Sequence, residues 1–296
     1  MICFDAHCDT ISELLNQNKE LKKNDLHIDA ERMGKYESYT QVFAAFIDPV
    51  YKECAMDRAK TIIERFYMCM EKNNITVCRN YSDWINAKTA VKAFLSLEGG
   101  EPIQSLSDLH ELYDMGVRMI APTWNFKNQL ACGINEEQET GLTSFGREII
   151  KEMNRLNIIT DVSHLGQKSF YDVAEISEKP LCASHSCAKA LNGHRRNLTD
   201  EQFKIIKASG GVVGVNYYTE FAGNDISDVV EHIKHFMSLG GEENIGLGSD
   251  FDGVESLPNG ISGVQDTEKL IKMLPYSTEI KEKIAYKNFA RLITML

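Results

Sequence analysis

The segment Ile158-Ile159-Thr160-Asp161-Val162-Ser163-His164 shows the pattern on which the fold depends, a short β-branched apolar run that ends in polar residues. A segment with helical periodicity precedes it over residues 142–156, with Ile149 and Met153 on one face. Asn157, between the two, is typical of a residue that ends a helix. The pattern predicts a helix followed directly by a buried strand.

The same alternation recurs along the whole chain. Eight strand-like runs stand out, at residues 2–8, 41–47, 93–98, 117–122, 158–164, 181–185, 211–216 and 245–250. Apolar strands separated by helices predict a parallel sheet covered on both faces, and eight of them predict closure into a (β/α)8 TIM barrel of the metal-dependent hydrolase type. An open doubly wound sheet is the alternative, but no GxGxxG follows the first strand.

The length of 296 residues suits one barrel, so we expect a single domain over residues 1–296. Helix starts are expected at Ser107-Asp108, Thr143-Ser144 and Thr199-Asp200-Glu201, whose side-chain oxygens can accept from free backbone amides. Residues 267–296 are expected to form two helices, broken near Pro275, that cover the barrel after its eighth strand.

The net charge of −11 repels phosphate backbones and anionic membrane surfaces. We therefore expect neither a nucleic-acid nor a membrane partner. The chain also lacks a membrane-spanning apolar run and a signal-peptide pattern, which predicts a cytoplasmic protein. Its eight cysteines contain no CxxC pair and are expected to be mainly buried free thiols.

Polar residues with metal-binding atoms close five of the predicted strands. In a parallel barrel these strand ends open onto one face, so residues distant in sequence converge there. The residues, in strand order, are His7 and Asp9 on the first strand, Glu98 on the third, His164 on the fifth, His185 on the sixth and Asp250 on the eighth.

This residue set suits a pair of metal ions. His7 and Asp9 are two apart in an extended strand and can hold one cation together. His164 and His185 offer imidazole nitrogen, a preferred donor for zinc, and Glu98 has two oxygens that can bridge two cations. Taken singly, each histidine could be a hydrogen-bonded core residue, and Glu98 could cap a helix or pair with an arginine.

Two neighbouring cations can stabilise a bridging hydroxide and polarise a carbonyl oxygen, which is the chemistry of amide hydrolysis. A carboxylate must then return a proton to the leaving amine. Asp250 and Asp252 both qualify, but Asp250 is nearer the strand end, and Asp252 better suits a turn that binds backbone amides. No G-x-S-x-G, H-E-x-x-H or P-loop motif competes with this interpretation.

Six motifs, taken in order, resemble the renal (membrane) dipeptidase family of zinc peptidases. They span nearly the whole chain and are specific as a set. The motifs are Phe4-Asp5-Ala6-His7-Cys8-Asp9, Leu97-Glu98-Gly99-Gly100, Asp161-Val162-Ser163-His164, Ser184-His185-Ser186, Arg195-Arg196-Asn197 and Gly248-Ser249-Asp250-Phe251-Asp252-Gly253.

The resemblance implies two zinc ions per chain and a dipeptide substrate, with D-residues often accepted at the C-terminal position. It assigns His7 and Asp9 to one zinc, His164 and His185 to the other, and Glu98 to the bridge between them. Asp250 would carry the proton. Arg196 would bind the terminal carboxylate of the substrate, although a solvated loop pair with Arg195 is the simpler alternative. The sequence leaves open whether the chain forms a homo-oligomer.

One motif departs from the eukaryotic form of the family. Those enzymes carry a histidine after strand four that contacts the substrate carbonyl, whereas this chain reads Ala121-Pro122-Thr123-Trp124-Asn125, as in bacterial relatives. Trp124 and Asn125 are therefore the candidates to line the substrate pocket. The pocket tyrosine of the family has no secure match among Tyr217, Tyr218 and Phe221.

Two other functions remain open at this point. The same metal site could hydrolyse another small amide, a lactam or an ester, or the barrel could bind metal without catalysing a reaction. The complete set of ligands and the proton carrier favour a metal-dependent dipeptidase.

Overall fold

The computed structural model of the protein describes residues 1–296 and contains eight parallel strands arranged as a barrel. Neighbouring strands follow the order β6-β5-β4-β2-β1-β9-β8-β7. Their bounds are β1 (Ile2–Cys8), β2 (Ser38–Phe46), β4 (Val91–Glu98), β5 (Val117–Ala121), β6 (Ile159–Thr160), β7 (Cys182–Ala183), β8 (Val212–Val215) and β9 (Ile245–Leu247). The predicted (β/α)8 barrel is confirmed, and a ninth strand, β3 (Thr76–Val77), adds to the edge of β4 and was not expected.

The barrel closes between β6 and β7, which are only two residues long. A single parallel bridge joins Asp161 to Cys182, and Val162 N donates to Cys182 O over 2.7 Å. The predicted strands at 158–164 and 181–185 are longer than the observed ones. They shorten because the Asp161 carboxylate accepts the Ser163 and Ser184 backbone N–H groups, which replaces further ladder bonds.

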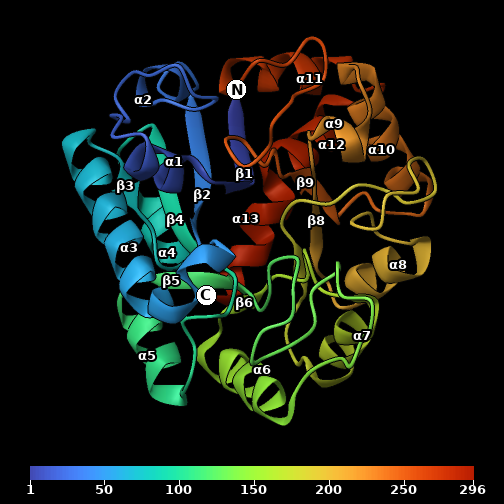
Figure 1. Ribbon diagram of the computed structural model, residues 1–296. Coiled ribbons are helices and arrows are strands. Elements are labelled where there is room, and N and C mark those ends of the chain that lie inside the picture. The colour runs from blue at the N-terminus through green and yellow to red at the C-terminus, as the bar shows by residue number, and fades with distance from the viewer.

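Helices surround the strands, as Figure 1 shows for α3, α5, α6, α7, α8 and α10. Shorter helices occupy the loops and the C-terminal region. The bounds are α1 (Thr10–Asn16), α2 (Ala30–Met33), α3 (Ala55–Lys72), α4 (Tyr81–Asn86), α5 (Leu106–Asp114), α6 (Ser144–Leu156), α7 (Gln167–Ile176), α8 (Asp200–Ala208), α9 (Thr219–Ala222), α10 (Ile226–Ser238), α11 (Thr267–Met273), α12 (Thr278–Glu282) and α13 (Asn288–Leu292). None of these helices combines the length and apolarity needed to cross a membrane.

Two of the three predicted helix starts are correct. Thr143 caps α6 by accepting from Gly146 N, and Thr199 forms a capping box with Gln202 at α8. The start predicted at Ser107-Asp108 is wrong by two residues, because Ser105 is the cap of α5 and accepts from Asp108 N. Asn157 ends α6 in a left-handed conformation with φ of 55°, as expected.

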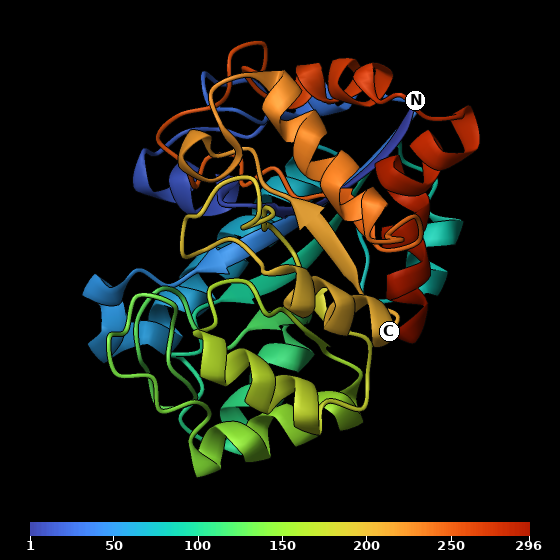
Figure 2. The ribbon, with the colours of Figure 1, turned by 90° about the vertical axis from the view of Figure 1, so that its right-hand side faces the viewer.

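The C-terminal helices close the end of the barrel where the strands begin. Phe289, Leu292 and Ile293 pack with inward-facing strand residues such as Phe4 and Phe94 in one buried apolar cluster. In Figure 2 these helices lie beside the start of the chain. The predicted break near Pro275 separates α11 from α12, but a π-helical segment, Lys283–Lys287, interrupts the expected second helix.

Strand β1 changes its inward face before it ends. Its pairing with β2 contains a bulge between Asp5 and Cys8. Phe4 belongs to the inner cluster before the bulge, whereas Cys8 belongs to the other buried cluster after it. The extra residue therefore turns His7 and Asp9 toward the mouth of the barrel, an effect typical of bulges beside functional sites.

Candidate active site and metal centre

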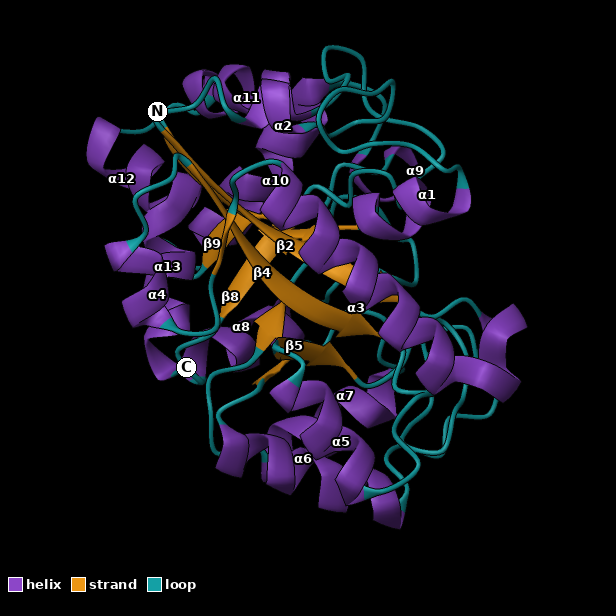
Figure 3. Ribbon diagram, turned by 90° about the vertical axis from the view of Figure 1, so that its left-hand side faces the viewer, coloured by secondary structure: helices purple, strands orange, loops and turns teal.

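The six predicted strand-end residues lie together at the C-terminal mouth of the barrel. Figure 3 shows the loops gathered at this end, opposite α4 and α13. All six side chains are buried, with exposed fractions between 0% and 8%. The fold therefore buries polar side chains that water solvates in the unfolded chain. Burying them costs free energy unless a binding partner compensates.

Glu98 lies at the centre of the group and faces histidines on two sides. Its Oε2 is 3.2 Å from His7 Nε2, and its Oε1 is 2.8 Å from His164 Nε2 and 3.8 Å from His185 Nε2. His7 Nε2 also lies 3.4 Å from Asp9 Oδ2. One carboxylate thus contacts His7 through one oxygen and His164 through the other, while the His7 and His185 rings lie 4.0 Å apart, centre to centre.

The ligand atoms fit bound cations. Two three-residue groups, His7–Asp9–Glu98 and Glu98–His164–His185, each place their ligand atoms within 4.8 Å of one another. His164 Nε2 and His185 Nε2 are only 2.7 Å apart. His7 Nε2 and Asp9 Oδ1 are buried without a hydrogen-bond partner. Mixed imidazole and carboxylate donors in this arrangement suit zinc and similar divalent ions.

Electrostatics differ between the two groups of ligands. Burial, with Arg196 adding to it, lowers the pKa of His164 to about 4. Burial and the nearby His7 hold the pKa of His185 well below its usual value. Burial alone would raise the pKa of Glu98 and lower that of His7, but their attraction for each other outweighs it, so the carboxylate stays ionised and the pKa of His7 is raised well above its usual value. The lone pairs of His164 and His185 are therefore free for a metal ion, whereas a metal ion at His7 would displace a proton.

Asp250 follows β9 and points into the same group. Its Oδ1 lies 3.8 Å from His7 Nε2, and Asn216 Nδ2 donates to its Oδ2 over 2.8 Å. Burial, together with the charge of Glu98, raises the pKa of Asp250. Asp252 is occupied elsewhere, because its carboxylate accepts from Thr10 Oγ1 and from His27 N, both over 2.6 Å.

Three residues at this mouth have left-handed backbone conformations, which glycine adopts most easily. The φ angles are 68° for His164, 62° for Asp250 and 68° for Asp252. The backbone turns sharply at each of these points, which aims the side chain back over the barrel.

Arg196 is a buried cation without a partner. It is 6% exposed, and its Nε and Nη2 atoms have no hydrogen-bond acceptor. Its guanidinium carbon lies 5.4 Å from the centre of the Phe221 ring. The solvated-loop alternative is therefore wrong for Arg196, whereas Arg195 is exposed. A buried, unpaired guanidinium favours an anionic ligand.

Trp124 and Asn125 both line the site but contact different parts of it. Asn125 Oδ1 lies 2.8 Å from His164 Nδ1, so it accepts the Nδ1 proton and leaves Nε2 free. The Trp124 ring packs edge-on between Phe46 and Phe126, with centroid distances of 5.3 and 5.9 Å. Asn125 therefore orients a candidate metal ligand, and Trp124 forms a wall.

The group opens into a cavity of about 380 Å³. Its lining includes Glu98, Trp124, His164, Arg196 and Asp250. Of the three uncertain aromatic positions, Tyr218 and Phe221 line this cavity, whereas Tyr217 is fully buried and does not.

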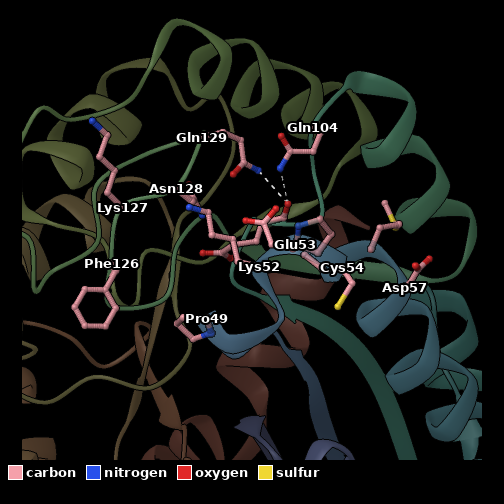
Figure 4. A pocket seen from close by; sticks show the side chains of 14 residues that line it. Pro49, Lys52, Glu53, Cys54, Asp57, Gln104, Phe126, Lys127, Asn128 and Gln129 are labelled. Atoms are coloured by element: carbon pink, nitrogen blue, oxygen red, sulfur yellow. Dashed lines mark hydrogen bonds between the residues drawn. The ribbon is translucent and has the colours of Figure 1, made fainter.

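A second and larger hollow of about 740 Å³ lies beside the mouth, between the 3-10 helix Pro49–Cys54 and residues 126–129. Figure 4 shows its lining, which mixes lysines, carboxylates and amides such as Lys52, Glu53 and Gln129. None of the six strand-end residues lines it. The chemistry is therefore in the smaller cavity.

Sequence reasoning missed residues that support the site. Asn216 follows β8 and orients Asp250, but an asparagine at a strand end carries no distinctive signal. His232 lies outside the site, is 1% exposed and accepts from Ala188 N, because α10 packs this face inward. The free-thiol expectation holds for all eight cysteines, and only Cys54 is exposed.

A (β/α)8 barrel whose mouth holds buried histidines around a shared carboxylate defines a metal-dependent hydrolase. The particular family follows from the sequence. The chain belongs to the membrane dipeptidase family, peptidase family M19, which matches it over residues 1–295. The protein is therefore a metal-dependent dipeptidase, an enzyme that hydrolyses peptide bonds.

Named relatives agree with this assignment. An uncharacterized dipeptidase of Schizosaccharomyces pombe is 32% identical over 87% of this chain and 68% of the relative. A metallopeptidase structure described as dipeptidase AC is 29% identical to this chain and superposes with a TM-score of 0.91. The match covers 99% of this chain and 98% of the chain in that structure. A metallopeptidase from Rhodobacter sphaeroides, bound to a phosphinate mimic of L-Ala-D-Ala, is 28% identical with the same coverage and TM-score.

Proposed function

We propose that residues 1–296 form one catalytic domain, a binuclear zinc dipeptidase that accepts D-residues at the C-terminal position. The observation that carries the proposal is that a buried, unpaired Arg196 and the Glu98-centred ligand group line one cavity of about 380 Å³. A cavity of this volume is at the small end of the range for ligand sites, which suits a two-residue substrate.

The residues divide into two ligand sets. His7 and Asp9 would hold one zinc, His164 and His185 would hold the other, and Glu98 would bridge them. Two zinc ions, when bound, supply a hydroxide nucleophile at neutral pH and polarise the scissile carbonyl. The distances of the two Glu98 oxygens support this division, because Oε2 lies 3.2 Å from His7 Nε2 and Oε1 lies 2.8 Å from His164 Nε2.

Asp250 moves the proton. The Asp250 carboxylate would accept a proton as the nucleophile attacks and then donate it to the leaving amine, a role that the raised pKa of Asp250 favours. The Asn216 amide holds one of its oxygens, so the other oxygen faces the cavity.

Arg196 binds the C-terminal carboxylate, which gives its unpaired donors an acceptor. This contact would fix which peptide bond reaches the zinc ions and would exclude peptides that are extended beyond this carboxylate. The L-Ala-D-Ala mimic bound by the Rhodobacter sphaeroides relative supports a substrate with a D-residue next to that carboxylate.

The test joins metal analysis with a substrate panel. Chelator-treated protein is reconstituted with zinc and assayed on L-Ala-L-Ala, L-Ala-D-Ala, their C-terminal amides, a β-lactam and an ester. We expect two zinc ions per chain, zinc-dependent cleavage of both dipeptides and poor cleavage of the amides. Glu98→Ala and His185→Ala should lose zinc and activity together. Full dipeptide turnover by zinc-free protein, or preferred cleavage of the lactam or ester, refutes the proposal.

A further inference from the structure

A buried chain of hydrogen bonds leads away from His185, on the side opposite the proposed zinc ion. His185 Nδ1 lies 2.8 Å from Ser184 Oγ, and the Ser184 hydroxyl donates to Asp161 Oδ2. All three side chains are nearly inaccessible, with exposed fractions of 0%, 0% and 3%. Nothing in the proposed reaction uses Asp161 or Ser184, so their burial beside a ligand needs another explanation.

The direction of each bond in this chain is fixed. Asp161 Oδ1 accepts from Ser163 N over 3.0 Å and from Ser184 N over 2.9 Å, which locks the carboxylate in place. Its Oδ2 can then only accept from the Ser184 hydroxyl. Because that hydroxyl has one proton, Ser184 Oγ must accept from His185 Nδ1. The imidazole therefore carries its proton on Nδ1 and directs the Nε2 lone pair at Glu98 and His164.

We infer that Asp161 is a positioning residue that acts through Ser184 to hold His185 in the tautomer that binds zinc. The two ligands of this zinc are oriented differently, because His164 donates to the neutral Asn125 amide and His185 is connected to a carboxylate. The inference rests on the proposed function and deepens it.

Asp161→Asn reverses the chain of hydrogen bonds while preserving its shape. The two backbone N–H groups still require an oxygen at the Oδ1 position, so the new amide nitrogen takes the Oδ2 position and donates to Ser184 Oγ. The Ser184 proton then turns toward His185 Nδ1, which at 2.8 Å is nearer than Ser163 Oγ at 3.4 Å. This favours the tautomer whose Nε2 carries hydrogen. Zinc binding at His185 then requires the tautomer that these hydrogen bonds disfavour.

The measurement is zinc affinity by competition with a chelating dye. We expect Asp161→Asn to bind one zinc as the parent protein does and the other 10- to 100-fold more weakly, the range typical for partners of metal ligands. Ser184→Ala should weaken the same zinc ion by about tenfold. In the Ser184→Ala background, Asp161→Asn should lower the zinc affinity by less than a further threefold, because the connection to His185 is already broken.

Asp5 supplies a matched control. Its Oδ1 also accepts two backbone N–H groups, from His7 over 3.2 Å and from Ser249 over 3.1 Å. Its Oδ2 has no hydrogen-bond partner, so no chain of hydrogen bonds leads from it to a histidine ring. Asp5→Asn should therefore keep both zinc affinities within about threefold of the parent values, even if it lowers the melting temperature. A loss equal to that of Asp161→Asn would overturn the inference, because any buried carboxylate at this depth would then have the same effect.

A spectroscopic readout is independent of activity. In zinc-saturated protein labelled with 15N-histidine, the His185 Nδ1–H proton should be protected from exchange and shifted downfield, and it should move upfield in Asp161→Asn. Unchanged zinc affinity in Asp161→Asn refutes the inference that Asp161 acts through Ser184. An equal loss of zinc affinity on Asp161→Asn in the parent protein and in the Ser184→Ala background refutes it too. A parent protein that binds no zinc refutes the proposed function instead, so the two failures are distinguishable.

Discussion

In the proposed function, Arg196 is the residue that distinguishes a dipeptide from other small amides. We expect Arg196→Met to lower kcat/KM for L-Ala-L-Ala by at least about 100-fold, since removing one partner of a buried charge pair costs roughly 2–5 kcal/mol. Zinc content should not change, because Arg196 is not a proposed ligand. Steady-state kinetics on the dipeptide and on its C-terminal amide measure the effect. Equal kcat/KM values in parent and variant would show that the carboxylate binds elsewhere.

In the proposed function, Asp250 carries a proton and does not bind zinc, so a variant at this position can separate chemistry from metal binding. Asp250→Asn keeps the size of the side chain but cannot carry the proton, so kcat should fall by about 10²- to 10⁴-fold. KM and the zinc content should change little. Metal analysis and kinetics on the same preparation test this, and a variant that loses zinc in step with its activity would make Asp250 a ligand.

The positions of His7, Glu98, His164 and His185 could be predicted because each ends an apolar run, and a parallel barrel brings such ends together. Their partners could not. Asn125, Ser184 and Asn216 act through single hydrogen bonds whose donors and acceptors depend on the folded geometry. Such neutral residues occur in any loop, so sequence gives them no periodicity or spacing that would mark them.

Among the elements, the eight barrel strands followed from periodicity, but the short strand β3 and the ends of the strands did not. The bulge in β1 and the two-residue strands β6 and β7 arise where side chains compete with the ladder for backbone groups. The π-helical segment Lys283–Lys287 likewise depends on packing against β1 and β9. Local pattern predicts that an element exists, whereas these contacts decide where it stops.

The closing helix α13 gives a prediction about stability. Phe289 is 1% exposed, and its ring lies 5.4 Å from that of Phe4. Phe289→Ala leaves a cavity at the base of the barrel and should reduce the free energy of unfolding by about 3–5 kcal/mol in urea titrations. Met273→Ala, which removes an apolar side chain that is 42% exposed on α11, is the control and should change it by less than about 0.5 kcal/mol. A similar small change for both variants would mean that α13 does not close the core.

For the whole molecule, the site draws residues from strands all around the barrel, so zinc should stabilise the entire fold. Burial, with the charge of Glu98, raises the pKa of Asp9 from 3.8 to about 7. Between pH 4 and 7 the zinc-free native state therefore keeps a proton that the unfolded chain has lost, and its stability falls as pH rises through this window. Zinc must displace that proton, so it binds more weakly in acid.

We accordingly expect zinc to raise the melting temperature more at pH 8 than at pH 5.5. At a free concentration about 1,000 times the Kd, the stabilisation is about 4 kcal/mol. Thermal scans in zinc-buffered solution at the two pH values measure this. His185→Ala should lose most of the shift, and equal shifts in the parent protein at both pH values would contradict the role given to Asp9.

The left-handed turns at His164 and Asp250 set a limit on how this enzyme can be improved. Each turn costs roughly 1 kcal/mol relative to glycine, which adopts the same shape freely. A laboratory selection that rewards heat resistance alone should therefore enrich glycine at both positions and yield robust proteins that no longer work. Obtaining a more stable and still active enzyme from this chain requires that every round of selection also measure turnover.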